Sequence, residues 1–144
     1  MDDLEQIRQL KYRYVRTLDT KDWEGFATCL TADVVGRYGG LDLDGRDDLV
    51  DFMRTNMTPD LVTLHQVHHP EIAVTGDEAR GTWYLQDKVI VAAHRFVLEG
   101  AAFYDDRYVR TPEGWRIAET GYRRTYEMTW SMDDAPSLTV KHEG

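Results

Sequence analysis

The hydrophobic pattern of this chain changes its period once, near Leu61. Before that point, apolar residues recur every three or four positions, which is typical of a helix with one buried face. After it, apolar and polar residues alternate over long stretches, which is typical of strands with one buried face. Helices followed by hairpin-connected strands predict an α+β fold in which an antiparallel sheet packs on N-terminal helices.

The pattern places the elements as follows. Helices are predicted over residues 2–19, 22–30 and 46–56, a short strand over 33–38, and four long strands over 63–74, 80–91, 98–110 and 115–126. Leu4, Ile7, Leu10, Tyr14 and Leu18 form the apolar stripe of the first helix. Since no repeat or flexible linker divides the chain, residues 1–144 are predicted to form one domain, with residues 128–144 as a C-terminal tail. If the sheet curls around the helices, the fold is a conical barrel with an interior cavity.

Charge and cysteine content exclude several classes of function. The chain carries 17 Lys+Arg against 26 Asp+Glu, a formal net charge of −9. Binding to nucleic acid or to anionic membranes needs a basic surface, so neither partner is expected. A single cysteine allows no internal disulfide, and no apolar run is long enough to span a membrane. With an acidic start in place of a signal peptide, the expected location is the cytoplasm.

Two carboxylates occupy positions that a surface role does not explain. Asp19 lies at the C-terminal end of the first predicted helix, where it opposes the helix dipole. It either caps the next helix or orients a catalytic base. Asp87 falls on a strand face otherwise formed by apolar side chains, so it needs a partner such as Arg124. That pair would be either structural or functional.

The run His65-Gln66-Val67-His68-His69 raises the question of a metal site. On a regular strand His65 and His69 share one face and His68 points to the other. No third ligand is evident, so zinc is not expected. A single histidine acting as general base fits better, because its pKa lies near working pH, although a hydrogen-bonded core histidine is the simpler alternative. A structural role is also the simpler explanation for Tyr14, because a tyrosine on the apolar stripe of a helix usually packs in the core.

The sequence contains no motif of a serine nucleophile, no glycine-rich nucleotide-binding loop and no pair of cysteines spaced to bind zinc. The order of elements instead resembles the SnoaL-like, or nuclear-transport-factor-2-like (NTF2-like), superfamily of conical α+β barrels. Longer strings resemble the bile acid 7α-dehydratase family of lyases. They are Lys11–Asp19, His68–Ile72, Trp83–Lys88, Ala102–Tyr104 and Glu119–Glu127.

That resemblance implies a set of site residues. Its catalytic positions fall on Tyr14, Asp19 and His65, and its substrate-binding positions on Tyr38, Asp87, Arg124, His68 and Trp83. His65 is then the general base, Asp19 orients its imidazole, and Tyr14 assists the departing hydroxyl. No metal or cofactor is implied, because the carbonyl of the substrate accepts the electrons. The resemblance also implies a homo-oligomer, most simply a trimer that packs through the outer face of the sheet.

The implied function is a lyase that removes water from a 7-hydroxy-3-oxo-4-ene bile acid or a related steroid. Two alternatives stay open on the sequence. One is another lyase or isomerase of the same superfamily, such as a polyketide cyclase, a dehydrochlorinase or a ketosteroid isomerase, since each of them begins with proton abstraction. The other is a small-molecule-binding domain without catalysis. It would not require Tyr14, Asp19 and His65 together.

Overall fold

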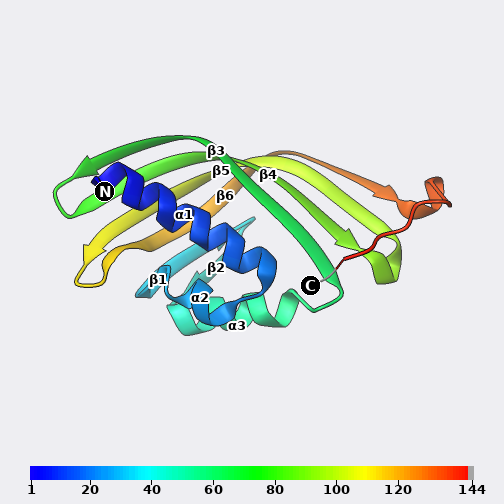
Figure 1. The fold of residues 1–144 in the computed structure, drawn as a ribbon, viewed down its shortest axis with the longest axis horizontal. Coiled ribbons are helices and arrows are strands. Elements are labelled where there is room, and N and C mark those ends of the chain that lie inside the picture. Colours follow the sequence, from blue (N-terminus) through cyan, green and yellow to red (C-terminus); the bar gives the residue numbers. More distant parts are fainter. Residues whose placement is uncertain (143–144) are drawn as a thin grey trace.

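The computed structural model describes residues 1–142 and confirms the α+β class. Two α-helices come first, two strands and a third helix follow, and four long strands complete a six-stranded curved sheet (Figure 1). The helices are α1 (Asp3–Thr20), α2 (Trp23–Ala27) and α3 (Arg46–Asn56), with single 3₁₀ turns η1 (Ala92–His94) and η2 (Met132–Asp134). The strands are β1 (Leu30–Tyr38), β2 (Leu41–Asp44), β3 (Leu61–Thr75), β4 (Glu78–Val91), β5 (Phe96–Thr111) and β6 (Gly114–Ser131).

The sheet has the order β2-β1-β6-β5-β4-β3 and does not close into a barrel. It arches over the helices, with α1 lying along its concave face (Figure 1). All pairs are antiparallel except β1 with β6, which is parallel and joins the two halves of the chain. The pattern did not predict β2, which is only four residues long. Its hairpin uses Gly39 and Gly40, both with positive φ, as a two-residue turn of this kind requires.

The boundaries of the first two helices follow from their caps. Asp2 accepts a hydrogen bond from the Glu5 backbone N–H (2.8 Å) and starts α1, and Lys21 ends it in a left-handed conformation. The predicted stripe of α1 is buried except for Leu4, which is exposed. The cap of α2 is Asp22, which accepts from the Gly25 N–H (2.9 Å). Asp19 is therefore free for another role.

The predicted C-terminal tail, residues 128–144, begins inside the last strand. Strand β6 continues to Ser131, so that it includes residues 128–131, the first four of the predicted tail. After η2 the chain crosses back toward the start of β3 (Figure 1). Residues 143 and 144 of the predicted tail lie outside the described residues. Within the described part of the chain, none of the helices is long and apolar enough to cross a membrane.

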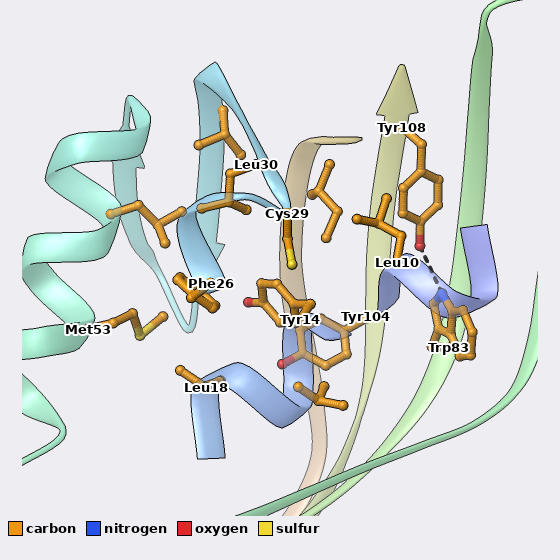
Figure 2. Close-up of a cluster of buried hydrophobic side chains, with 14 of the residues drawn as sticks. Leu10, Tyr14, Leu18, Phe26, Cys29, Leu30, Met53, Trp83, Tyr104 and Tyr108 are labelled. Carbon is orange, nitrogen blue, oxygen red and sulfur yellow. Dashed lines mark hydrogen bonds between the residues drawn. The ribbon is translucent and has the colours of Figure 1, made fainter. Parts of the chain in front are cut away.

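The core lies between the helices and the concave face of the sheet (Figure 2) and contains a buried ion pair. Lys11 of α1 reaches across to β5, where its Nζ lies 2.8 Å from Asp106 Oδ2, and both side chains are fully buried. Asp106 also accepts hydrogen bonds from Tyr108 (2.7 Å) and Thr120 (2.6 Å). The Lys11 ammonium lies 3.4 Å from the centre of the Tyr104 ring. This network ties α1 to the middle of the sheet.

We expect the buried tyrosines to make the protein sensitive to alkali. Burial raises the pKa of Tyr14, Tyr38, Tyr104 and Tyr108, and burial lowers the pKa of Lys11. A tyrosine with a raised pKa stabilises the fold below the unfolded value near pH 10, and that contribution is lost as the pH rises toward the folded value. Lys11 acts in the opposite direction, but it is one group against four. The free energy of unfolding should therefore fall above about pH 10.

Urea unfolding at pH 8, 9, 10 and 11 measures this effect. Each proton that is bound in the folded state and lost in the unfolded state lowers the free energy of unfolding by up to about 1.4 kcal/mol per pH unit. The free energy should therefore fall more steeply between pH 10 and 11. Tyr104→Phe removes one of the four groups and should make the slope smaller. A free energy of unfolding that stays level from pH 8 to 11 would contradict the expectation.

Candidate active site

Asp19 and His65 form a hydrogen-bonded dyad where the end of α1 meets the start of β3. The Nδ1 atom of His65 lies 2.6 Å from Asp19 Oδ1, and the backbone N–H of His65 donates to Asp19 Oδ2 (2.8 Å). The Thr63 hydroxyl donates to Oδ1 as well (2.8 Å). Both side chains are mostly buried, with 14% of His65 and 19% of Asp19 exposed. Three bonds thus fix the carboxylate, and the carboxylate fixes the imidazole.

The dyad leaves one ring nitrogen for chemistry. An ionised carboxylate only accepts hydrogen bonds, so Nδ1 of His65 is the donor and Nε2 of the neutral ring carries a lone pair. Among the described residues, none hydrogen-bonds to Nε2. This arrangement suits a general base, because Asp19 sets the tautomer and stabilises the imidazolium that forms.

Asp87 and Arg124 form the ion pair that the sequence suggested. Asp87 lies directly opposite His65 in the β3–β4 ladder. Both of its carboxylate oxygens accept from Arg124, at 2.5 Å from Nη1 and 2.7 Å from Nη2. The Nε atom of Arg124 lies 3.1 Å from Glu127 Oε1. The hydrogen bonds to Asp87 raise the pKa of Arg124, so its cation is permanent.

The two predicted tyrosines, Tyr14 and Tyr38, form a second hydrogen-bonded pair. The hydroxyls of Tyr14 and Tyr38 lie 2.6 Å apart and are buried. Tyr122 connects them to the ion pair, since its ring centre lies 5.7 Å from that of Tyr38 and 5.2 Å from the Arg124 guanidinium. Tyr122 and Glu127 were not among the residues predicted for the site. Tyr122 could have been found by alternation, because it stands two residues before Arg124.

The structure does not bring Trp83 and His68 to this site. Trp83 is buried in the core, where its indole N–H donates to the Tyr108 hydroxyl (2.9 Å, Figure 2). His68 stands opposite Tyr84 on the outer, convex face of the sheet. It lines a groove of about 420 Å³ there with His69, Tyr84, Leu85, Gln86, Ala101 and Tyr126.

The prediction that His65 and His69 share a face is wrong. The β3–β4 register shifts between His68 and Glu71, and His69 has a left-handed backbone (φ 48°). This bulge turns the His69 ring to the outer face, where it contacts Tyr84 edge to face. Within residues 1–142, no three His, Cys, Asp or Glu side chains are grouped as metal ligands.

A cavity of about 500 Å³ opens beside the dyad. The end of α1, the start of β3 and the C-terminal segment surround it. Its lining residues are Asp19, Thr20, Lys21, Pro59, Leu61, Val62, Thr63 and His142. A small molecule could therefore approach the Asp19 side of the dyad from this end of the sheet.

Comparison with known proteins agrees with this architecture. Residues 1–121 match the profile of the SnoaL-like domain family. The chain belongs to the SnoaL-like domain family. An uncharacterized protein of Mycobacterium tuberculosis, Rv2910c, is 28% identical to it over 120 residues, which cover 81% of this chain and 82% of the relative.

Solved structures show the same SnoaL-like fold. A candidate scytalone dehydratase of Novosphingobium aromaticivorans superposes with a TM-score of 0.80 at 20% identity, covering 87% of this chain and 85% of that one. A hexachlorocyclohexane dehydrochlorinase of Novosphingobium barchaimii, LinA-type3, gives a TM-score of 0.79 at 16% identity and 88% coverage of both chains. At these identities the likeness concerns the fold, while the dyad of this chain stands on its own geometry.

Proposed function

We propose that this SnoaL-like protein is a lyase that removes water from a 7-hydroxysteroid carrying a 3-oxo-4-ene, such as a bile acid. The observation that carries the proposal is the Asp19–His65 dyad, whose Nε2 is unengaged by the described residues. It lies directly across the β3–β4 ladder from Asp87, which is paired with Arg124. The resemblance of the strings Trp83–Lys88 and Glu119–Glu127 to bile acid 7α-dehydratases supports the choice of substrate.

The reaction needs one base and one donor. His65 takes the proton from C6 through Nε2, and Asp19 stabilises the resulting imidazolium. The electron pair moves through the double bond to the 3-oxo oxygen, and its return breaks the bond between C7 and the hydroxyl. Hydroxide is a stronger base than tyrosinate, so the Tyr14–Tyr38 pair can supply the proton that makes water. The proton that His65 took from C6 then reprotonates the tyrosine pair.

The charges around the site indicate whether the steroid is bound free or as a coenzyme A thioester. The ionisable partners of His65 are Asp19, through a hydrogen bond, and Asp87, across the ladder. Arg124 is already bound by Asp87 and Glu127. Among the described residues that line the cavity beside the dyad, Lys21 is the one lysine or arginine, and its ammonium donates to the Leu61 backbone oxygen (2.7 Å). One lysine is not a cluster that would bind the phosphates of a coenzyme A thioester. The proposed substrate is therefore a free or weakly charged steroid.

The test is to supply a 7α-hydroxy-3-oxo-4-ene bile acid to the purified protein. Dehydration gives a conjugated dienone, whose absorbance at longer wavelength reports turnover directly. A 3-oxo-5-ene steroid and hexachlorocyclohexane, offered in parallel, test for an isomerase and a dehydrochlorinase. Turnover of either one without dehydration would replace the proposal by that activity. Tight steroid binding without any turnover would indicate a binding domain.

We also propose that the protein is a homotrimer that packs through the outer face of the sheet. Four large side chains there are about half exposed: Leu64, Tyr84, Tyr126 and Met128. Leu64 and Met128 flank the Lys88–Glu99 ion pair (3.0 Å) in one row of the sheet, so a second copy would meet apolar area together with charges of both signs. Light scattering should give three times the chain mass of 16.7 kDa, and Tyr84→Asp/Tyr126→Asp should give the monomer. A monomeric parent would contradict the proposal.

A further inference from the structure

One cross-strand row on the concave face contains three ionisable residues and a glycine. The ladder pairs His65 of β3 with Asp87 of β4, Asp87 with Gly100 of β5, and Gly100 with Glu127 of β6. Neighbouring strands lie about 4.8 Å apart, so Asp87 and Glu127 face each other across roughly 10 Å. The missing side chain at Gly100 leaves the space between them open.

The guanidinium of Arg124 fills this space. Arg124 stands opposite Ala102, one row away, and a shift of register between Ala101 and Ala102 turns it toward Gly100. From there its Nη atoms reach Asp87 and its Nε lies beside Glu127. A Cβ added to Gly100 would lie 2.7 Å from Nη1 of Arg124 and 2.7 Å from the backbone oxygen of Tyr126. Neither contact is possible without movement, so any larger residue would displace the arginine.

We infer that Gly100 is a positioning residue: it seats Arg124 so that Arg124 holds Asp87 away from His65. Two carboxylates flank this histidine, Asp19 through a hydrogen bond and Asp87 across the ladder. Arg124 occupies both oxygens of Asp87, so only Asp19 binds the imidazole. Without that clamp, Asp87 would be an unpaired carboxylate beside Nε2. It would then accept an N–H from Nε2 and occupy the nitrogen that has to remove the proton.

The catalytic part of this inference rests on the proposed function, whereas its structural part does not. Nitrogen NMR of the ¹⁵N-labelled protein separates Nδ1–H from Nε2–H in each histidine. His65→Gln identifies the His65 signals by their loss. The parent should show a proton on Nδ1 alone. Gly100→Ala should show a proton on Nε2, and Gly100→Ala/Asp87→Asn should return the parent pattern, because it removes the competing carboxylate.

Gly81→Ala is the matched control. Gly81 is also a buried strand glycine, but an added Cβ would meet the Tyr108 ring at 3.0 Å and no atom of Arg124. It should leave the His65 signals as in the parent. If Gly100→Ala does not fold, Arg124→Met removes the clamp without a backbone clash and should give the same Nε2 proton. A parent-like tautomer in a folded Gly100→Ala, or in Arg124→Met, would overturn the inference.

Turnover provides a separate measurement. With the steroid substrate, Gly100→Ala should lower kcat by about a hundredfold and change KM little, as expected when a catalytic group is misplaced. If the parent does not dehydrate the steroid, the proposed function fails, while the NMR comparison still decides the role of Gly100. If the parent is active and the tautomer of Gly100→Ala is unchanged, only the role of Gly100 fails.

Discussion

His65→Gln should lower kcat for steroid dehydration by about 100- to 10,000-fold, the usual contribution of a positioned general base. Glutamine keeps a side-chain N–H that can donate to Asp19, so the packing at the end of α1 survives. It has no basic nitrogen in place of Nε2, so the C6 proton has no acceptor. The measurement is the rise of the dienone absorbance under saturating substrate, together with the free energy of unfolding to confirm that the variant folds.

Two further variants make this result specific. Asp19→Asn should also lower kcat strongly, because an amide can present either a donor or an acceptor to Nδ1 and no longer fixes the tautomer. His69→Asn is the control on the same strand: asparagine tolerates the left-handed backbone of this residue, and the side chain lies on the outer face. It should turn over at the parent rate. Native rates in both His65→Gln and Asp19→Asn would rule out the dyad as the catalytic centre.

Asp106→Asn should lower the free energy of unfolding by about 3–5 kcal/mol, the usual effect of breaking a buried ion pair. The asparagine has nearly the same shape. Its one carbonyl oxygen can accept from one of the two hydroxyls, Tyr108 or Thr120, and its amide N–H can donate to the other. It carries no charge, however, so the ammonium of Lys11 would remain buried without its counterion. Burial of an unpaired charge, rather than loss of packing, causes the expected destabilisation. Urea unfolding at pH 7 measures it.

The double variant Lys11→Met/Asp106→Leu separates these causes. It replaces both charges with apolar groups and should recover most of the lost stability, because exchanging a whole buried pair is often close to neutral. Glu99→Gln is the matched control, since it breaks the exposed pair with Lys88 and should cost no more than about 1 kcal/mol. An Asp106→Asn protein within about 1 kcal/mol of the parent would show that the pair is not important for stability.

The sequence predicted much of this site because ionisable residues on apolar faces stand out. Asp87 was recognised in this way, and its partner Arg124 with it. The same reasoning could have found the core pair. Lys11 lies four residues after Ile7 and three before Tyr14, on the apolar stripe of α1, and Asp106 alternates with buried Tyr104 and Tyr108 on β5.

Other features depend on geometry that a local pattern does not contain. The bulge at His69 reverses the face of one side chain, and a strict alternation cannot foresee it. Trp83 does point to the concave face, as expected. It lies where α1 covers the sheet and contacts Tyr12, so it packs in the core. Which end of a strand borders the site is decided by where the helices lie, and this is a long-range property.

The parallel pair of β1 and β6 has a consequence for how the protein folds. Tyr38 of β1 pairs with Tyr122 of β6, 84 residues further along the chain. Contacts between such distant residues form slowly, because a long loop has to close before they contribute. During synthesis, β1 and the Tyr14–Tyr38 pair therefore have no neighbour on that side until the last strand has been made. The candidate site residues near the start of the chain are brought together only after the last strand has formed.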